Sequence, residues 1–366
     1  MESLSTSRSE FNKKNIIIER KISMKAKSKN INFYNLSFEF VETNVMFVSD
    51  FKNGRWDEGK LLPLGPIQIS PAAGILNYGQ GIFEGMKALR TKNGEITLFR
   101  PIENAKRFNI SAERLMMPLY DESTFVENIK SVVKANENFV PPYDSGGSLY
   151  IRPLMIGSGP ILGVAPAKEY KFIIFTSPVG SYFPNGFNGI DIEISRKYTR
   201  ASQGGTGFSK TCSNYAGTMK PAVEAKKKGF SQILYLDSIH MEYVSEVGAA
   251  NFCAIINNNL VTPRLDGTIL EGITLKSVME LAEKKLYIDV KERDISYKAL
   301  FYQSCTECFC TGTAAVITPI SSISFENKRK IFNNGKPGSI TTKLYELLTG
   351  IQRKDFKDEF GWTVFI

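Results

Sequence analysis

A lysine at the end of a glycine-rich loop is the strongest candidate for chemistry in this chain. The loop reads Gly204-Gly-Thr-Gly-Phe-Ser-Lys210, and a helical pattern starts near Asn214. Glycines let a backbone approach a ligand closely because no Cβ intervenes. A lysine that loses its hydration water becomes a nucleophile or a base. The spacing fits neither a Walker A loop nor a dinucleotide fingerprint, and by itself the loop is explained as well by a structural turn.

Three other segments carry groups that could bind an anion or need a buried partner. Glu271-Gly-Ile-Thr274 begins a helix, whose free N–H groups form an anion site. Cys310-Thr-Gly-Thr-Ala-Ala315 is a turn of small residues whose hydroxyls and amides could face a phosphate or a carboxylate. Glu246 precedes Gly248-Ala-Ala-Asn251, and an acid among small apolar neighbours needs a partner if it is buried.

Several other chemistries lack a necessary residue. His240 is the single histidine, so Ser-His-Asp catalysis, Cys-His catalysis and any His-rich metal site would all require it. It follows the apolar residues 233–236, in a pattern that predicts a hairpin connection. Cys305 and Cys308 form a lone C-x-x-C without the second pair that zinc would need. We therefore expect no metal, and buried free thiols at the start of a strand.

Composition favours a soluble protein with two domains. The chain has 366 residues, of which 42% are hydrophobic and 23% charged, and no apolar run approaches the roughly 20 residues that span a bilayer. Its net charge is +9, but residues 1–30 contribute +5 of this with eight Lys/Arg against three Glu. The remaining surface is nearly balanced, so neither a nucleic-acid nor a membrane partner is expected.

The basic N-terminal residues are expected to be a flexible extension. They are Ser-rich and lack a hydrophobic stretch long enough for secretion. A cytoplasmic location is the first prediction, with organelle targeting by this extension as the alternative.

Hydrophobic spacing predicts two mixed α/β segments. In the first, strands are expected at residues 67–70, 96–99, 148–156 and 171–176, a hairpin turn at 92–94, and a helix over 102–115 that places Asn104 and Arg107 on one face. In the second, strands are expected at 190–194, 233–236 and 251–256, a helix over 214–228 with a kink at Pro221 and an end at Gly229, and a helix over 274–285. Residues 178–189 are rich in Gly, Pro and Asn and predict a linker. The predicted division is an extension at 1–38, a small domain at 39–177, an interdomain loop at 178–189 and a large domain at 190–366.

A series of short motifs then occurs in one order over residues 40–366. The runs are Tyr78-Gly-Gln-Gly-Ile-Phe-Glu-Gly-Met-Lys-Ala88, Leu98-Phe-Arg-Pro-Ile-Glu-Asn-Ala-Lys-Arg107, Tyr150-Ile-Arg-Pro-Leu154, residues 204–216, residues 246–251, Ile269-Leu-Glu-Gly-Ile-Thr274, Thr311-Gly-Thr-Ala314 and Gly361-Trp-Thr363. Together they resemble the fold-type IV pyridoxal-phosphate (PLP) enzymes, and within them the plant and bacterial branched-chain amino-acid aminotransferases. An ordered series is far more specific than one motif.

The resemblance implies a fold, a reaction and an assembly. The fold would be a two-domain α/β protein with mixed sheets and its active site at the domain interface. The reaction would be a ping-pong transamination, in which L-leucine, L-isoleucine or L-valine and 2-oxoglutarate give the branched 2-oxo acid and L-glutamate. The enzyme would serve branched-chain amino-acid biosynthesis as a homodimer.

The resemblance also implies cofactor-binding residues. Lys210 would hold PLP covalently and then move a proton at the substrate Cα. Glu246 would keep the pyridine nitrogen protonated, and Tyr215 would hydrogen-bond the cofactor's phenolic oxygen. The phosphate would be held by groups suited to an anion: Arg107, the amides of Ile273 and Thr274, and Thr313.

On the substrate side, the resemblance assigns two carboxylate sites and an apolar wall. The α-carboxylate would bind Tyr150 and the amides of Thr313 and Ala314. Arg152 would pair with the distal carboxylate of glutamate. The apolar wall would come from three aromatic residues and from a loop of the neighbouring subunit: Phe83, Tyr78 and Tyr182, with Leu162 and Val164 from the neighbour.

Some alternatives stay open at this point. Phe83, Tyr78 and Arg152 could be ordinary structural residues, and the bulky Phe208-Ser209 pair before the lysine departs from the expected small residues. A D-amino-acid aminotransferase or an aminodeoxychorismate lyase would keep Lys210 and Glu246. A non-catalytic pseudo-enzyme on the same scaffold is the alternative from another class.

Overall fold

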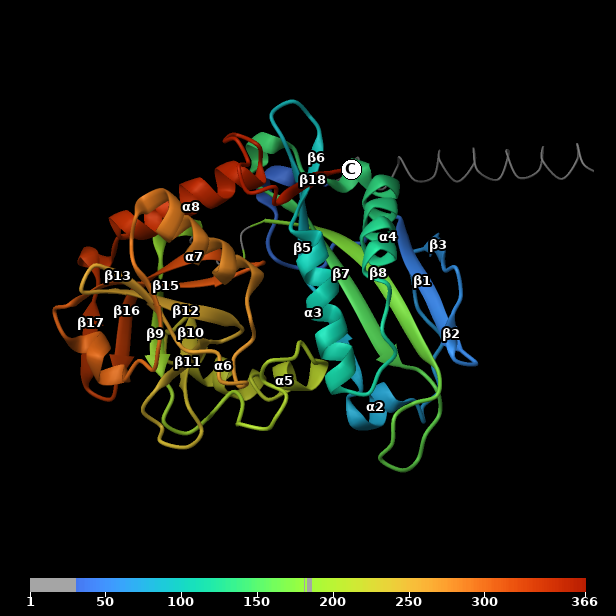
Figure 1. Cartoon of the computed structure of the whole chain (residues 1–366), viewed down its shortest axis with the longest axis horizontal. Helices are drawn as coiled ribbons and strands as arrows, with labels where there is room; N and C mark the ends of the chain where they lie inside the picture. The colour runs from blue at the N-terminus through green and yellow to red at the C-terminus, as the bar shows by residue number, and fades with distance from the viewer. Residues whose placement is uncertain (1–30, 181, 183–185) are drawn as a thin grey trace, which may run out of the picture.

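The structure is a computed structural model that describes residues 31–180, 182 and 186–366. Their strands form two nine-stranded sheets, each with its own helices (Figure 1). The mixed α/β architecture predicted from the sequence is therefore confirmed. Short 3-10 helices lie between the larger elements, at η1 (Phe33–Asn35), η2 (Glu137–Phe139), η3 (Tyr143–Ser145), η4 (Gly186–Asn188), η5 (Tyr297–Phe301) and η6 (Asn333–Gly335).

The first sheet has the order β18-β6-β5-β7-β8-β1-β2, with β3 beside β1 and β4 beside β7. All its pairings are antiparallel, and β7 and β8 pair along their whole length. Its strands are β1 (Val45–Lys52), β2 (Arg55–Trp56), β3 (Lys60–Pro63), β4 (Gly81–Phe83), β5 (Met86–Arg90), β6 (Ile96–Phe99), β7 (Ser148–Gly157), β8 (Tyr170–Val179) and β18 (Thr363–Phe365).

Two amphipathic helices cover this sheet, and the short α2 (Gly74–Tyr78) lies at its lower end in Figure 1. Helix α3 (Pro101–Arg114) begins with proline, which is tolerated where the N–H has no helical partner. The side chain of Asp121 accepts a hydrogen bond from the Thr124 amide and so caps α4 (Glu122–Ala135). Phe108, Phe125 and Phe172 are fully buried between these helices and the sheet. The predicted helix at residues 102–115 is confirmed.

The second sheet has the order β11-β10-β9-β16-β15-β12-β13-β14, and β11 also pairs with β12, so part of the sheet closes on itself. Strand β9 lies parallel to both β10 and β16. The strands are β9 (Ile190–Ile194), β10 (Gln232–Leu236), β11 (Val244–Val247), β12 (Ala250–Ile256), β13 (Asn259–Thr262), β14 (Val290–Glu292), β15 (Cys305–Gly312), β16 (Val316–Phe325) and β17 (Lys328–Ile331).

Helices α7 (Ile273–Leu286) and α8 (Ser339–Gln352) pack on the second sheet, as Figure 1 shows. The predicted apolar face of α7, with Val278, Leu281 and Ala282, is fully buried against Leu344 and Leu348 of α8. Helices α5 (Cys212–Ala216) and α6 (Met219–Lys227) follow the glycine-rich loop. No helix within the described ranges has both the length and the apolar character needed to cross a membrane.

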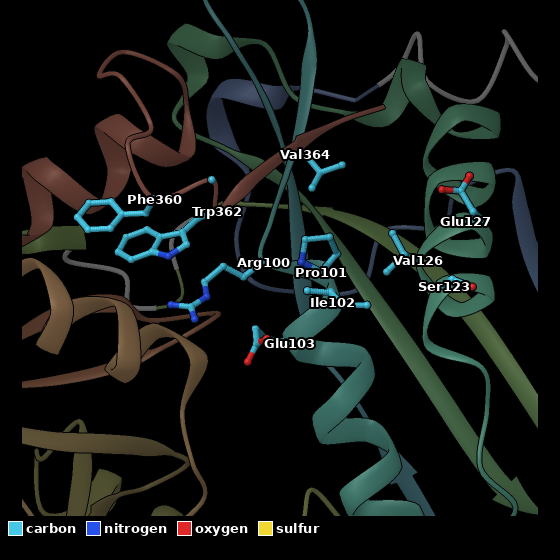
Figure 2. Close-up of a pocket in the computed structure, with 11 residues that line it drawn as sticks. Arg100, Pro101, Ile102, Glu103, Ser123, Val126, Glu127, Phe360, Trp362 and Val364 are labelled. Carbon is cyan, nitrogen blue, oxygen red and sulfur yellow. The ribbon is translucent and has the colours of Figure 1, made fainter.

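The C-terminal strand returns to the first sheet, although the predicted division groups residues 190–366 together. Strand β18 pairs with β6, and the Arg100 amide donates to the Trp362 carbonyl at 2.7 Å. Figure 2 shows the Arg100 side chain beneath the Trp362 ring, and its guanidinium carbon lies 5.1 Å from the ring centre. Arg100 also donates to Ser277 of α7 at 3.0 Å. This crossing joins the first sheet and its helices, called the first half below, to the second sheet and its helices, called the second half.

Two local predictions were wrong. Residues 67–70 form no strand, because Pro66 and Pro71 flank them and neither can donate a backbone hydrogen bond to a ladder. Ile67 and Ile69 instead pack on the sheet without pairing. The helix after the loop breaks at residues 217–218 and not at Pro221, which lies in the first turn of α6 where a missing N–H costs little. Gly229, with a φ of 90°, ends that helix as predicted.

Candidate active site

A cavity of about 410 Å³ lies between the two halves of the molecule. Most of the residues selected from the sequence line it. From the first half come Phe83, Arg107, Tyr150 and Arg152, and from the second half come Lys210, Tyr215, Glu246, Ile273, Thr274, Thr313 and Ala314, with Tyr182 from the segment between them. The structure therefore gathers side chains that are up to 231 positions apart in the sequence.

Lys210 is held in the cavity by contacts with the first half. Its amide donates to the Ser111 hydroxyl of α3 at 2.9 Å, and its carbonyl accepts from the Phe83 amide at 3.0 Å. The ammonium group lies 3.0 Å from the Tyr215 hydroxyl and 4.8 Å from the centre of the Phe83 ring. The backbone of Lys210 is therefore fixed by the first half, and its amine is held inside the cavity by Tyr215.

The glycine-rich loop before Lys210 runs close to a neighbouring backbone. A Cβ on Gly207 would lie 2.2 Å from the Thr268 carbonyl oxygen, so only glycine fits there. Asn214 donates to the carbonyls of Thr206 and Ser209 at 2.7 and 2.9 Å, which ties the loop to the start of α5. The loop is thus a close-packed support that presents the lysine.

Glu246, on β11, is buried and has the partner that its apolar surroundings require. Its Oε2 lies 2.5 Å from Nη1 of Arg200, which is also buried. Asn251 donates to Oε1 at 3.3 Å. The Arg200 contact lacks hydrogen-bond geometry, so Oε2 accepts no hydrogen bond from the described residues. Burial raises the pKa of Glu246 above its ordinary value of 4.5, although the charge of Arg200 acts in the opposite direction.

Arg107, on α3, is held by a second buried carboxylate, which the sequence did not single out. Its Nε and Nη2 donate to the two oxygens of Glu84 at 2.7 and 2.9 Å. Nη1 donates to the carbonyl of Glu271, immediately before α7, at 3.0 Å. Asn104, which we expected on the same helix face as Arg107, also donates to Glu84, at 2.8 Å. The arginine is therefore fixed beside the start of α7.

The start of α7 faces the cavity with unused donors. Gly272 precedes the helix, and no side chain caps it, so the first amides are free to bind an anion. A Cβ on Gly272 would lie 1.9 Å from Asn251 Oδ1, so any larger residue there would have to displace the Asn251 side chain. Thr313 donates its hydroxyl to the Gly85 carbonyl at 3.1 Å. The buried hydroxyl of Thr311 has no hydrogen-bond partner among the described residues, and it lines the same cavity.

The substrate-side residues form a connected aromatic and cationic wall. Arg152 donates to the Tyr150 hydroxyl at 3.1 Å, and its guanidinium carbon lies 4.6 Å from the centre of the Phe83 ring. Tyr182 and Tyr150 both pack edge-on against Phe38, at 5.0 and 5.4 Å. Phe38 also lines the cavity. Phe38 belongs to none of the motifs found in the sequence, so the sequence did not indicate that it lines the site.

Three of the predicted residues lie outside this cavity. Tyr78 ends α2, is 41% exposed, and donates its hydroxyl to the carbonyl of Leu162. Leu162 and Val164 are 93% and 88% exposed. Within this chain Tyr78 contacts Leu162, and none of the three residues lines the cavity.

The remaining candidates have structural positions. His240 is exposed in the turn before β11, as predicted, and interacts with Asp237. Cys305 and Cys308 are buried free thiols at the start of β15, with sulfurs 3.6 Å apart. In residues 31–180, 182 and 186–366 no cluster of His, Cys, Asp or Glu could hold a metal. A cavity of about 460 Å³ beside Arg100 and Trp362 contains none of the predicted site residues (Figure 2).

The chain is similar to known proteins over most of its length. Residues 81–323 match the family model described as "Amino-transferase class IV". The chloroplastic branched-chain amino acid aminotransferase 2 of Humulus lupulus is 44% identical over 335 residues, covering 91% of this chain and 81% of its own. The branched-chain-amino-acid aminotransferase 2 of Bacillus subtilis is 42% identical, covering 90% and 91%.

A solved structure shows the same fold. It is the crystal structure of the branched-chain amino acid aminotransferase of Escherichia coli, at 25% identity and a TM-score of 0.75, covering 87% of this chain and 98% of its own. The resemblance inferred from the motifs, and the fold that it implied, are confirmed.

Proposed function

Because the chain belongs to the class IV aminotransferases, we propose that it transfers the amino group of L-leucine, L-isoleucine or L-valine to 2-oxoglutarate with PLP as its cofactor. The observation that carries this proposal is the cavity in which Lys210, Glu246 and Arg107 meet. The names of the Humulus lupulus and Bacillus subtilis relatives support the choice of branched-chain substrates.

The groups in the cavity fit PLP. Glu246 has a buried oxygen without a hydrogen bond and a raised pKa despite the charge of Arg200, so a protonated ring nitrogen would supply the hydrogen-bond donor that it lacks and further positive charge. The uncapped start of α7, Arg107 and the unpartnered Thr311 hydroxyl suit a phosphate. Lys210 and Tyr215 contact each other in the same cavity, as residues that face the reacting end of the cofactor would.

Each of these site residues then has a task in the transfer. When bound, the cofactor supplies the electron sink that stabilises negative charge at the substrate Cα. Lys210 holds the cofactor and afterwards moves the proton at Cα as a general base. Tyr215, 3.0 Å from the lysine amine, orients it. Glu246 keeps the ring nitrogen protonated, and Arg107 with the amides of Ile273 and Thr274 binds the phosphate.

The other wall of the cavity selects the substrate. Tyr150 and the amides of Thr313 and Ala314 bind the α-carboxylate. Phe83 and Tyr182 supply an apolar surface for the side chain, and Arg152 binds the distal carboxylate of glutamate. A hydrophobic pocket distinguishes side chains that differ by one methylene by only about 1–3 kcal/mol, so all three branched-chain amino acids are expected to be substrates.

The exposed group of Tyr78, Leu162 and Val164 completes a neighbouring copy of the site in this proposal. Leu162 and Val164 are two positions apart and almost fully exposed, and an exposed apolar patch is typical of an interface. The hydrogen bond from Tyr78 to Leu162 makes these residues one unit, so we assign Tyr78 to the partner's cavity together with the other two. The assembly is then a homodimer with shared active sites.

The compartment depends on the basic residues 1–30, which lie outside the described residues. The prediction remains the cytoplasm. The chloroplastic Humulus lupulus relative supports the alternative, an organelle destination for this extension.

Replacing Lys210 tests the function directly. Lys210→Ala is expected to abolish turnover of L-leucine with 2-oxoglutarate and to remove the absorbance change that L-leucine causes in the wild-type spectrum. The fold should persist, as circular dichroism would show. Lys220→Ala, which removes a 70% exposed lysine side chain on α6, is the matched control and should stay active. A wild-type protein that uses D-alanine but not L-leucine would contradict the proposed substrate.

A further inference from the structure

The turn of Thr313, Ala314 and Ala315 separates two cavities. One side of the turn lines the candidate active site, and the other side lines a second cavity of about 300 Å³. Ala314 and Ala315 line both. In the proposed function the α-carboxylate of the substrate binds the amides on the first side. A positive charge on the second side therefore attracts the bound carboxylate across the turn.

Lys87 provides a charge on that second side. It lies on β5, and its ammonium group donates to the carbonyl of Ala314 at 3.1 Å. Lys87 is also paired with Tyr150 across β5 and β7, and side chains at directly opposed positions share one face of a sheet. The lysine therefore contacts the turn that carries the two amides of the α-carboxylate site, and it lies beside Tyr150, the third group of that site.

No carboxylate neutralises this lysine in the part of the chain that the structure describes, where Lys87 forms no ion pair. The other titratable groups on the same cavity are Tyr345 of α8 and Arg353, which directly follows α8. Arg353 is held by the carbonyls of Tyr143 and Gly147 at 3.1 and 3.0 Å. Burial, and then the charge of Arg353, lower the pKa of Lys87 to about 8.

A bound anion is the partner that this arrangement lacks. The α-carboxylate groups named above, a phenol and two amides, carry no formal charge, and the proposed function assigns Arg152 to the distal carboxylate. A negative charge at the amides of Thr313 and Ala314 would stabilise the ammonium group, and the ammonium group would strengthen binding of the charge in return. The hydrogen bond to the Ala314 carbonyl also fixes the orientation of the turn.

We propose that Lys87 is a positioning residue for the α-carboxylate, which it attracts from behind the turn while it holds the Ala314 carbonyl. The inference rests on the proposed function, because that function puts the carboxylate on the other side of the turn. It concerns binding of the substrate and not the proton transfer, so the effect belongs in KM rather than in kcat.

The test measures binding of 4-methylpentanoate, which is leucine without its amino group, to the PLP-loaded protein by calorimetry. Lys87→Met is expected to weaken binding about tenfold at neutral pH, to raise KM for L-leucine by a similar factor and to leave the PLP dissociation constant unchanged. Wild-type affinity should fall as the pH rises above about 8, because Lys87 then loses its proton. Lys87→Arg keeps its charge at that pH and should not show this fall.

Lys92→Met is the matched control, since Lys92 follows the same strand and has a 67% exposed side chain; its affinity for 4-methylpentanoate should equal that of the wild type. Equal affinity and an equal pH profile in Lys87→Met would overturn the proposal. So would a Lys87→Met protein that loses PLP along with the carboxylate, because the lysine would then support the fold. If the wild type turns over L-leucine normally and Lys87→Met binds 4-methylpentanoate as the wild type does, only the role of Lys87 is wrong and the proposed function stands. A wild type without any such turnover contradicts the proposed function and the inference together.

Discussion

Each of two buried arginine–glutamate pairs has one member that lines the cavity, Arg107 in one pair and Glu246 in the other, and the pairs differ in how many hydrogen bonds the carboxylate accepts. Glu84, from the first half, accepts hydrogen bonds from Arg107 twice, from Asn104 and from the Gly85 amide. Glu246, from the second half, accepts one long hydrogen bond from Asn251 and has an ion contact with Arg200. The two carboxylates are equally buried, at 0% and 1% exposure.

The balance between burial on one side and arginine charge with hydrogen bonds on the other sets the direction in which each pKa moves. Burial alone raises the pKa of Glu84, but the attraction of Arg107 and the hydrogen bonds bring it below 4.5. Burial dominates for Glu246, whose pKa stays raised. A saturated pair is a fixed support, which here aims an arginine. An unsaturated pair keeps an acceptor available, which here faces the cavity.

The largest expected effect follows from breaking the saturated pair. Glu84→Gln leaves the charge of Arg107 buried without a counter-charge, which typically costs about 3–5 kcal/mol of folding free energy. Urea unfolding of the cofactor-free protein should show this loss, and the PLP dissociation constant should rise because Arg107 is no longer held. Glu103→Gln is the control: it removes a more exposed carboxylate from α3, the helix that carries Arg107, and its pair with Lys106 contributes about 0–1 kcal/mol. Equal losses in the two variants would contradict the role of Glu84 as a support.

The unsaturated pair should respond in the opposite way, with a larger effect on rate than on stability. Glu246→Gln also leaves a buried cation, Arg200, without its counter-charge. It is still expected to lose less folding free energy than Glu84→Gln, because fewer hydrogen bonds are lost and the ionised form of Glu246 is itself disfavoured in the folded protein. Turnover should fall about a hundredfold, since a preorganised charge at the ring nitrogen is lost, while PLP stays bound. Steady-state kinetics and an absorbance spectrum measure the two parts. A normal rate would disprove the assignment of Glu246 to the ring nitrogen.

The smallest effect is a difference in pH dependence between the two pairs. The folded pKa of Glu84 is below 4.5, so its stabilising contribution is complete above pH 4.5 and is lost as the pH falls through the folded pKa. The folded pKa of Glu246 is above 4.5, so folded protein binds the extra proton and loses stability as the pH rises from 4.5 through the folded pKa.

Unfolding of wild type, Glu84→Gln and Glu246→Gln over this pH range measures both slopes. Each variant should lack one of them. Saturating PLP should remove the Glu246 slope, because a protonated ring nitrogen stabilises the ionised carboxylate. Parallel slopes for the two variants would contradict the comparison.

Some of this site could be predicted because the signals are local. The helical spacing of Asn104 and Arg107 predicted their shared face, and both contact Glu84. The apolar surroundings of Glu246 predicted a buried acid with a partner. The helix start at residues 273–274 predicted free amides. Each of these follows from a few neighbouring residues and from general geometry of helices and turns.

Other parts could not be predicted, because they depend on contacts between distant segments. Arg200, the partner of Glu246, lies in the irregular segment after β9 and shows no pattern. Glu84 stood inside a recognised motif without an evident task. The unpartnered hydroxyl of Thr311 and the contact of Phe38 with two tyrosines depend on how the two halves pack. Conversely, residues 67–70 have the alternation of a strand, but the flanking prolines remove the hydrogen bonds that a strand needs.

The sequence by itself determined which chemistry this protein can carry out. One lysine after a glycine-rich loop, a buried acid and an anion-binding helix start leave few alternatives when the chain has a single histidine. Only the tertiary structure decided how Glu84 and Glu246 differ. It also decided that Lys87, which forms no ion pair with the described residues, lies behind the turn of residues 313–315. Local spacing sets which groups are present on an element. Hydrogen-bond saturation and burial are set by segments from both halves of the chain, so they become visible only after folding.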